Sequence, residues 1–348
     1  MTTMTARPAL DPELQGLLSS MPDAPPLNEE TLEMIRPYAT LPVETALAGR
    51  TVASQEISIA SFDGTQIVLT ILSPAGADLS AGNAPCVYWV HGGGMVMGDR
   101  YSQIDIPLDW LASFGAVVVS VDYRLAPEFS GTTLVEDCYA GLVWTAEHAS
   151  DLGIDPARLV IAGTSAGGGL AAGTTLLARD RKGPALAAQV LICPMLDHRN
   201  DTSSSHQFDG PAVWSRDANA FGWSSVLKDI GDMPVPGYVS PAIADDLSGL
   251  PATYIDVGSA EVFRDEAVTC ATRIWTAGGQ AELHVWAGGF HGFDALFPQA
   301  AISQAARRAR TDWLGRRCQP DPARPLRGPD QLPERRRHRS HLGRQLTG

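Results

Sequence analysis

Ser165 lies at the centre of a Gly-x-Ser-x-Gly pentapeptide, residues 163–167, between an apolar run and a segment that predicts a helix. In a sharp strand-to-helix turn, this pattern holds a serine hydroxyl in a strained backbone conformation at the top of a sheet. Side chains at 163 or 167 would clash with the closely packed turn, and the following helix favours developing negative charge at its N-terminus. The pattern predicts a nucleophilic serine. Taken alone, it also fits a phosphate-binding turn.

A second glycine-rich stretch, His91-Gly92-Gly93-Gly94, follows an earlier apolar run. Consecutive glycines let backbone N–H groups approach a ligand oxygen without interference from a Cβ atom. Acyl transfer needs such donors for its tetrahedral oxyanion, and one donor is worth roughly 10²–10³ in turnover. We expect Gly93, Gly94 and Ala166 to supply the donors and His91 to hold the loop through a ring hydrogen bond. This stretch favours acyl transfer over phosphate binding.

His291, in the stretch Gly-Gly-Phe-His-Gly-Phe, is the candidate base. A serine hydroxyl has too high a pKa to ionise alone, so a neutral imidazole must take its proton and later return it to the leaving group. His291 follows the last predicted strand, whereas the other histidines fall on a helix, within a strand, in an insertion or in the tail. No His-Glu-x-x-His or Cys-His cluster indicates a metal site, so we expect no metal and no cofactor.

A serine nucleophile and its histidine base are usually completed by a carboxylate, and several candidate carboxylates lie close together in the sequence. The stretch Gly-Ser-Ala-Glu-Val-Phe-Arg-Asp-Glu, residues 258–266, follows an apolar run and holds Glu261, Asp265 and Glu266. Asp256 lies inside the preceding run. Acids in such places can be helix caps, solvated surface or catalytic groups, and the stretch alone leaves the choice open.

The elements that must position these residues alternate between strand and helix. Short, nearly continuous apolar runs are separated by helical segments, which predicts a mostly parallel α/β sheet covered by helices on both faces. An alternating segment around Asp63-Gly64 predicts a hairpin at one edge. The segment of about forty residues over 197–237 interrupts this rhythm, and we expect it near the carboxyl ends of the strands, where α/β folds bind ligands.

Three regions follow from this pattern. Residues 1–50 carry short amphipathic helices without a sheet of their own, among them one with Asp11 as N-cap and Pro12 at its first position, and they predict a cap. Residues 51–318 form the α/β domain. Residues 319–348 are dense in proline and arginine without apolar periodicity, and we expect them to be disordered.

Bulk composition excludes some partners. The 348-residue chain has a net charge of −13, which argues against nucleic acid and anionic membranes. No apolar run is long enough to span a membrane, and the start lacks the apolar region of a signal peptide. Five widely spaced cysteines without a Cys-x-x-Cys pair predict free thiols in a reducing compartment, so we expect a cytoplasmic protein.

The stretches HGGGMVMGD, VDYRLAPE, GTSAGGG and GGFHGF, in this order and spacing, resemble the bacterial hormone-sensitive lipase family of α/β-hydrolases, in its GTSAG branch. The resemblance covers roughly residues 50–315. It implies an α/β-hydrolase fold with an N-terminal helical cap, no cofactor and a homodimer. Aligning the family's acid motif on Arg264-Asp265-Glu266 implies that Glu261 is the triad acid, where the family usually has Asp.

The expected activity is that of a serine carboxylesterase, with Ser165, Glu261 and His291 as triad and a short-chain carboxylic ester as substrate. The same machinery also serves amide, carbamate or aryl-ester hydrolysis, and a non-catalytic small-molecule receptor can share the fold. A receptor, however, has no need of a histidine at position 291. Five side chains could line the acyl or alcohol pocket, although each could equally be plain core: Met95, Met97, Phe208, Trp214 and Phe293.

Overall fold

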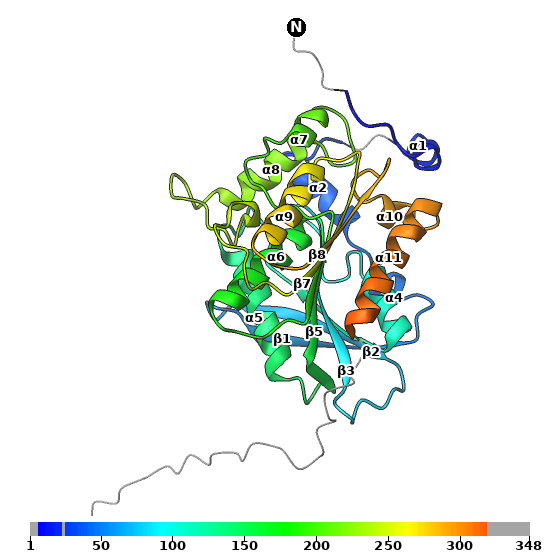
Figure 1. The fold of residues 1–348 in the computed structure, drawn as a ribbon, viewed down its shortest axis with the longest axis vertical. Coiled ribbons are helices and arrows are strands. Elements are labelled where there is room, and N and C mark those ends of the chain that lie inside the picture. The colour runs from blue at the N-terminus through cyan, green and yellow to red at the C-terminus, as the bar shows by residue number, and fades with distance from the viewer. Residues whose placement is uncertain (1–5, 23–24, 319–348) are drawn as a thin grey trace, which may run out of the picture. The chain divides into compact units, whose positions relative to one another are not determined.

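A computed structural model describes residues 6–22 and 25–318, and its central feature is one twisted sheet (Figure 1). The strands of the described chain are β1 (Val52–Ala60), β2 (Gln66–Pro74), β3 (Ala84–Val90), β4 (Val117–Asp122), β5 (Ile154–Thr164), β6 (Ala188–Ile192), β7 (Ala252–Gly258) and β8 (Ala281–Trp286). They form an eight-stranded sheet in the order β1-β2-β4-β3-β5-β6-β7-β8. Only the β1–β2 and β2–β4 pairs are antiparallel. The predicted mostly parallel sheet with a hairpin at one edge is confirmed.

Helices cover both faces of this sheet. On one face, α4 (Asp105–Phe114) packs beside α11 (Ala301–Cys318). On the other, α5 (Thr133–Glu147) and α6 (Ala166–Asp180) pack together, and α9 (Arg264–Thr276) covers β7 and β8 (Figure 1). The family of α/β folds expected from the sequence is therefore the one observed.

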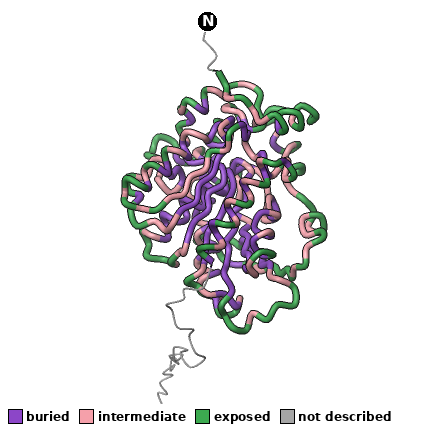
Figure 2. The backbone as a smooth tube through the Cα atoms, turned by 45° about the vertical axis from the view of Figure 1, so that its right-hand side comes forward, coloured by how far each residue is buried: buried purple, intermediate pink, exposed green. Residues whose placement is uncertain are grey.

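Burial follows the position of each strand in the sheet (Figure 2). Every residue of β3 is buried, because its neighbours are strands on both sides and helices on both faces. The edge strand β1 is mostly exposed. This gradient explains why the central strands are apolar at nearly every position, while β1 alternates.

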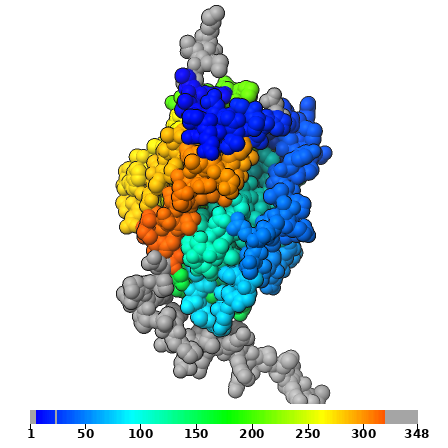
Figure 3. All heavy atoms as spheres, turned by 90° about the vertical axis from the view of Figure 1, so that its right-hand side faces the viewer, coloured from blue at the N-terminus to red at the C-terminus, as the bar shows by residue number. Residues whose placement is uncertain are grey.

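The N-terminal segment lies against the loop that follows β8. Helix α1 (Pro12–Leu18) begins as predicted, with the Asp11 carboxylate accepting the N–H groups of Glu13 and Leu14 at 2.9 and 3.2 Å. The Asp11 N–H donates to the carbonyl of Gly288 at 3.0 Å. Figure 3 shows this segment in dark blue against the orange region near residue 300. The remaining N-terminal elements are α2 (Leu32–Ile35), the 3-10 helix η1 (Arg36–Ala39) and α3 (Val43–Ala46).

The predicted insertion forms part of the connection from β6 to β7. It contains α7 (Ser203–Gln207) and α8 (Arg216–Leu227), and η2 (Pro241–Ile243) follows it. The Arg7 guanidinium donates to the carbonyls of Gln207, Asp209 and Pro211 at 2.7, 2.7 and 2.8 Å. The N-terminal segment thus ties down the insertion as well as the loop after β8.

The compact unit that contains the sheet ends at Cys318. The predicted disordered tail, residues 319–348, lies outside the described residues. Among the helices of the described chain, none combines the length and the hydropathy needed to cross a bilayer. The last short helix before α11 is α10 (Phe293–Leu296), which follows His291 directly.

Candidate active site

Ser165 stands between β5 and α6 in a strained turn. Its φ of 56° and ψ of −121° lie outside the regions that side chains prefer. The turn is closely packed: a Cβ atom on Gly163 would lie 2.2 Å from the Gly167 carbonyl oxygen, and one on Gly167 would lie 2.1 Å from that of Val90. Glycine is therefore needed at both positions, for the reason that the sequence pattern suggested.

A continuous chain of hydrogen bonds joins serine, histidine and a carboxylate. Ser165 Oγ lies 2.9 Å from His291 Nε2, and His291 Nδ1 lies 2.5 Å from Glu261 Oε2. The Glu261 side chain is only 1% exposed. The structure thus brings together three residues that are up to 126 positions apart, and it selects Glu261 among the candidate acids.

Glu261 is oriented by the loop that carries it. Its second carboxylate oxygen accepts the N–H of Gly258 at 2.8 Å, so the loop after β7 folds back on its own start. The N–H of Ala260 donates to the carbonyl of Gly289 at 2.9 Å, which joins this loop to the one that carries His291. A Cβ on Gly258 would lie 2.1 Å from that same carbonyl oxygen. The sequence offered no signal for this clamp.

The neighbouring acids have other partners. Asp265 and Glu266 both lie in the first turn of α9. The Asp265 carboxylate accepts the N–H of Ser204 at 2.7 Å, and the buried Glu266 accepts the N–H of Leu196 at 2.7 Å. Burial raises the pKa of Glu266 well above its ordinary value. Neither acid bonds to His291.

The surroundings of His291 favour its charged form. Burial opposes the imidazolium, but the Cys193 sulfur and the Glu261 carboxylate beside the ring outweigh burial and raise the pKa of His291. Burial also raises the pKa of the Cys193 thiol. The Glu261 carboxylate lies 2.5 Å from His291 Nδ1. A ring with this neighbour can stabilise the positive charge that proton abstraction creates.

The glycine-rich loop after β3 lies against the nucleophile turn. A Cβ on Gly92 would lie 3.0 Å from the Thr164 carbonyl oxygen, and one on Gly167 would lie 2.4 Å from that of His91. Gly93 and Gly94 have φ values of 123° and 62°. These contacts place the start of the glycine-rich loop against the turn between β5 and α6, whose first residue is Ala166.

His91 has the structural role that the sequence suggested. Its Nδ1 lies 2.7 Å from the Gly92 carbonyl oxygen, and its ring stacks on Tyr123 with centroids 4.2 Å apart. The Tyr123 hydroxyl donates to the His91 carbonyl at 2.9 Å. Burial lowers the pKa of His91 to about 4, so the ring is neutral and fixed.

Of the five apolar candidates for the pocket, Trp214 has the clearest place beside the triad. Its ring centroid is 6.1 Å from that of His291, and a Cβ on Gly94 would lie 2.3 Å from its ring. Phe263, which sequence analysis missed, meets the His291 ring edge-on at 5.0 Å. It was missed because an isolated phenylalanine in a loop looks like ordinary core.

The other four candidates are less directly placed. Met95 is buried and Met97 is partly buried in the glycine-rich loop. Phe208 is buried under the Arg7 guanidinium, which lies 5.0 Å from the ring centroid. Phe293 belongs to a second apolar cluster with Leu14 and Phe290.

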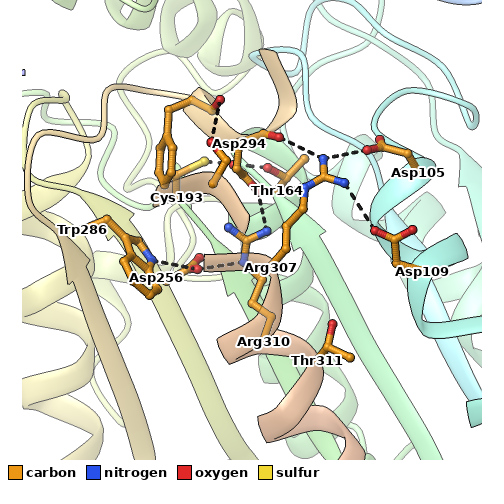
Figure 4. Close-up of polar contacts among 12 residues, drawn as sticks. Asp105, Asp109, Thr164, Cys193, Asp256, Trp286, Asp294, Arg307, Arg310 and Thr311 are labelled. Carbon is orange, nitrogen blue, oxygen red and sulfur yellow. Dashed lines mark hydrogen bonds and ion pairs between the residues drawn. The ribbon is translucent and has the colours of Figure 1, made fainter. Parts of the chain in front are cut away.

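A second set of charged side chains lies behind the His291 loop (Figure 4). Arg310 of α11 donates to Asp256 at 2.7 Å and to Asp294 at 2.6 Å, and all three residues are buried. Arg307 extends the set by donating to Asp105 at 2.6 Å. This cluster holds α11 against β7 and α10, and it engages the Asp256 carboxylate with Arg310 and not with His291.

The chain matches the family described as "alpha/beta hydrolase fold" over residues 87–295. It is 32% identical over 306 residues to Esterase LipI of Mycobacterium tuberculosis. This match covers 86% of this chain and 93% of LipI. Its fold is similar to that of a "Bacterial Heroin Esterase", with a TM-score of 0.82 and 34% identity over 90% of this chain and 99% of the other. The structure of esterase LipW from Mycobacterium marinum matches with a TM-score of 0.79 and 31% sequence identity. That match covers 91% of this chain and 100% of LipW.

The matches to LipI and to the heroin esterase span nearly the whole compact unit, and the family match over residues 87–295 includes Ser165, Glu261 and His291. We conclude that the chain belongs to the α/β-hydrolase family, in the group of esterases that resemble hormone-sensitive lipase.

Proposed function

We propose that this chain is a serine carboxylesterase in which Ser165 is the nucleophile, His291 the general base and acid, and Glu261 the acid that orients the ring. The observation that carries the proposal is the unbroken path of hydrogen bonds from Ser165 Oγ through His291 to Glu261. The esterase relatives support the same reaction class.

In the acylation step, His291 Nε2 takes the proton of Ser165 as Oγ attacks the ester carbonyl. Glu261 holds the proton on Nδ1, so Nε2 carries the lone pair that accepts the serine proton. Its negative charge then stabilises the imidazolium. His291 returns the proton to the leaving alcohol. A water molecule, activated by the same ring, releases the acid and regenerates Ser165.

The backbone N–H groups of Gly93, Gly94 and Ala166 are proposed to bind the oxyanion. Two features support this assignment: the glycine-rich loop packs against the nucleophile turn, and α6 begins at Ala166. Because positive φ values at Gly93 and Gly94 are strained for other residues, the loop conformation itself depends on glycine.

The substrate is proposed to be a short-chain carboxylic ester. Trp214 lies over Gly94 and beside His291, which narrows the space next to the nucleophile. The Arg7 hydrogen bonds hold the segment before Trp214 in place, so this wall is tied to the N-terminal cap. A long acyl chain would need this wall to move.

We further propose a cytoplasmic homodimer. The five cysteines are free and buried, which suits a reducing compartment. For the dimer, β8 is an edge strand, and Val285 and Trp275 beside it are 42% and 48% exposed. Light scattering on the purified chain measures the mass of the assembly directly, and a monomer at micromolar concentration would rule the dimer out.

The proposed activity is tested with p-nitrophenyl esters and a Ser165→Ala variant. We expect a loss of roughly 10⁴ or more in turnover with the fold intact, because triad members act as a unit. Ser113→Ala, an exposed serine on α4, is the matched control and should keep full activity. Butyrate should be hydrolysed faster than palmitate at matched solubility. A Ser165→Ala protein with a tenth of the original turnover would disprove the assignment.

A further inference from the structure

We propose that Cys193, Glu261 and His291 form an inhibitory site for a soft or borderline divalent cation such as Zn²⁺ or Cd²⁺. Within residues 6–22 and 25–318, these three are the only group of at least three Cys, His, Asp or Glu side chains whose ligand atoms gather closely enough to hold a metal ion. Their ligand atoms all lie within 4.8 Å of one another, and the three residue types are those that bind zinc in proteins.

The backbone places the Cys193 sulfur in this position. Cys193 follows β6 directly and has a φ of 36°, which is unusual for a residue with a side chain. Its N–H donates to the carbonyl of Asp256 at 2.7 Å, which fixes the turn. Its sulfur lies 3.7 Å from Thr164 Oγ1, next to the nucleophile (Figure 4). The proposed mechanism gives this thiol no task.

The spacing suits a tetrahedral ion after a small adjustment. Zinc–sulfur and zinc–nitrogen bonds of about 2.3 and 2.0 Å put neighbouring ligand atoms about 3.5 Å apart. The pair His291 and Glu261 must separate from 2.5 Å by about 1 Å. A cavity of about 10 Å³ borders Cys193 and Gly292, the residue after His291, and gives the side chains room to shift.

Metal binding here would remove the catalytic base. The thiol loses its proton to solvent and binds as a thiolate, while Glu261 binds as a carboxylate. If the metal takes His291 Nδ1, the neutral ring must carry its proton on Nε2 and cannot accept one from Ser165. If the metal takes His291 Nε2, it occupies the lone pair that would accept the proton of Ser165. Either way, the thiol proton is released, together with the second ring proton where His291 is charged, and the Ser165 hydroxyl loses its acceptor.

The proposed metal site rests on the proposed esterase function in one respect: its inhibition is measured through ester hydrolysis. We therefore test it with two measurements, the activity of the wild-type chain in Cd²⁺ or Zn²⁺ and the binding of Cd²⁺ to Ser165→Ala. The second uses calorimetry and the ultraviolet absorption of a Cd–thiolate bond, and it needs no turnover. The variants are Cys193→Ala and the matched control Cys270→Ala, which removes another buried cysteine, on α9.

We expect Cd²⁺ and Zn²⁺ to inhibit the wild-type chain and the Cys270→Ala variant alike, with recovery on adding EDTA. Cys193→Ala, measured relative to its own metal-free activity, should need at least about tenfold more metal for half inhibition, the smallest loss typical of a damaged metal site. Mg²⁺ and Ca²⁺, which prefer oxygen ligands, should have no effect at the same concentrations.

Equal inhibition of the wild-type chain and Cys193→Ala would overturn the inference, as would a Cys270→Ala variant that resists the metal. Absence of Cd²⁺ binding to Ser165→Ala would overturn it as well. If the wild-type chain hydrolysed no ester but Ser165→Ala bound Cd²⁺ through Cys193, the proposed function would fail and the metal site would stand.

Discussion

Two buried ionic networks lie close to the loop that carries His291, and they differ in their cation. In the first, Glu261 bonds to the His291 imidazole. In the second, Asp256 and Asp294 bond to the Arg310 guanidinium (Figure 4). Imidazole gains and loses a proton near neutral pH, whereas guanidinium stays charged throughout that range.

Because their cations differ, the two networks can serve different roles. In the proposed mechanism, the first network changes its charge within one catalytic cycle, because the proton of Ser165 moves onto His291. The second keeps its charges and can only hold elements in place. Asp294 lies three residues after His291. The second network therefore holds the chain in place just after the histidine that exchanges the proton.

The largest effect is expected from Glu261→Gln in the first network. The amide keeps the shape of the side chain but removes its charge and can favour the wrong tautomer of His291. We expect turnover to fall by up to roughly 10⁴, by analogy with amide-for-acid changes in other triads, with the melting temperature nearly unchanged. Stopped-time assays with a p-nitrophenyl ester measure the loss, and calorimetry checks the fold.

Glu261→Asp sharpens the same test, because it keeps the charge and shortens the reach by one methylene. We expect a partial loss of turnover, smaller than that of Glu261→Gln. If both variants lost activity equally, position 261 would act through packing and not through its charge.

In the second network, the expected damage is to stability. Arg310→Met leaves Asp256 buried without a cation and leaves Asp294 with Arg307, whose Nε lies 3.9 Å from the Asp294 carboxylate. Breaking a buried ion pair costs roughly 3–5 kcal/mol of unfolding free energy. Arg316→Met, on the same helix, is the matched control: its side chain is 59% exposed and its contact with Glu282 measures 3.4 Å. An exposed pair contributes about 0–1 kcal/mol. Urea unfolding compares the two, and equal losses would contradict the comparison.

The pH dependence of the hydrolysis rate should depend on the first network and not on the second. His291 must be neutral to accept a proton, and its raised pKa moves the acid limb of the profile upward. We expect kcat/KM to rise with pH through one ionisation with a midpoint above the ordinary histidine value of about 6.5, and to fall about tenfold per pH unit below it. EDTA should not change the rate of the purified wild-type chain.

Arg310→Met, where it folds, should keep the midpoint of the wild-type profile, because Arg310 does not touch His291. The residual activity of Glu261→Gln should have a lower midpoint, since the carboxylate that favours the imidazolium is gone. A midpoint of Glu261→Gln at or above that of the wild-type chain would show that Glu261 does not set this ionisation.

The two networks also differ in how far sequence could reveal them. The strands follow from short apolar runs, and Ser165 and His291 follow from motifs whose glycines have direct steric reasons. Glu261 needed a family alignment, because three acids stand in nine residues and only the fold-back of the loop onto Gly258 distinguishes them. That fold-back depends on contacts with the loop after β8, which lies about thirty positions away.

The second network was invisible for a different reason. Helix α11 has the sequence AISQAARRARTDWLGRRC, whose arginines predict a solvated surface helix. Arg310 is nevertheless 1% exposed, because Asp256 and Asp294 on other elements neutralise it. The sequence likewise does not distinguish Cys193 from the other cysteines, since nothing in its own segment indicates that β6 ends beside His291.

The smallest effect is expected at Asp265, the acid four positions from Glu261. Its carboxylate lies in the first turn of α9, accepts the Ser204 N–H and pairs with Arg264 at 2.8 Å. Asp265→Asn keeps an acceptor for Ser204 and removes only the charge near the helix N-terminus, which is worth about 0.3–1 kcal/mol. Turnover should be nearly unchanged. If instead Asp265→Asn abolished activity in a folded protein while Glu261→Gln was mild, the hydrogen bond from His291 to Glu261 would not be the one that supports catalysis.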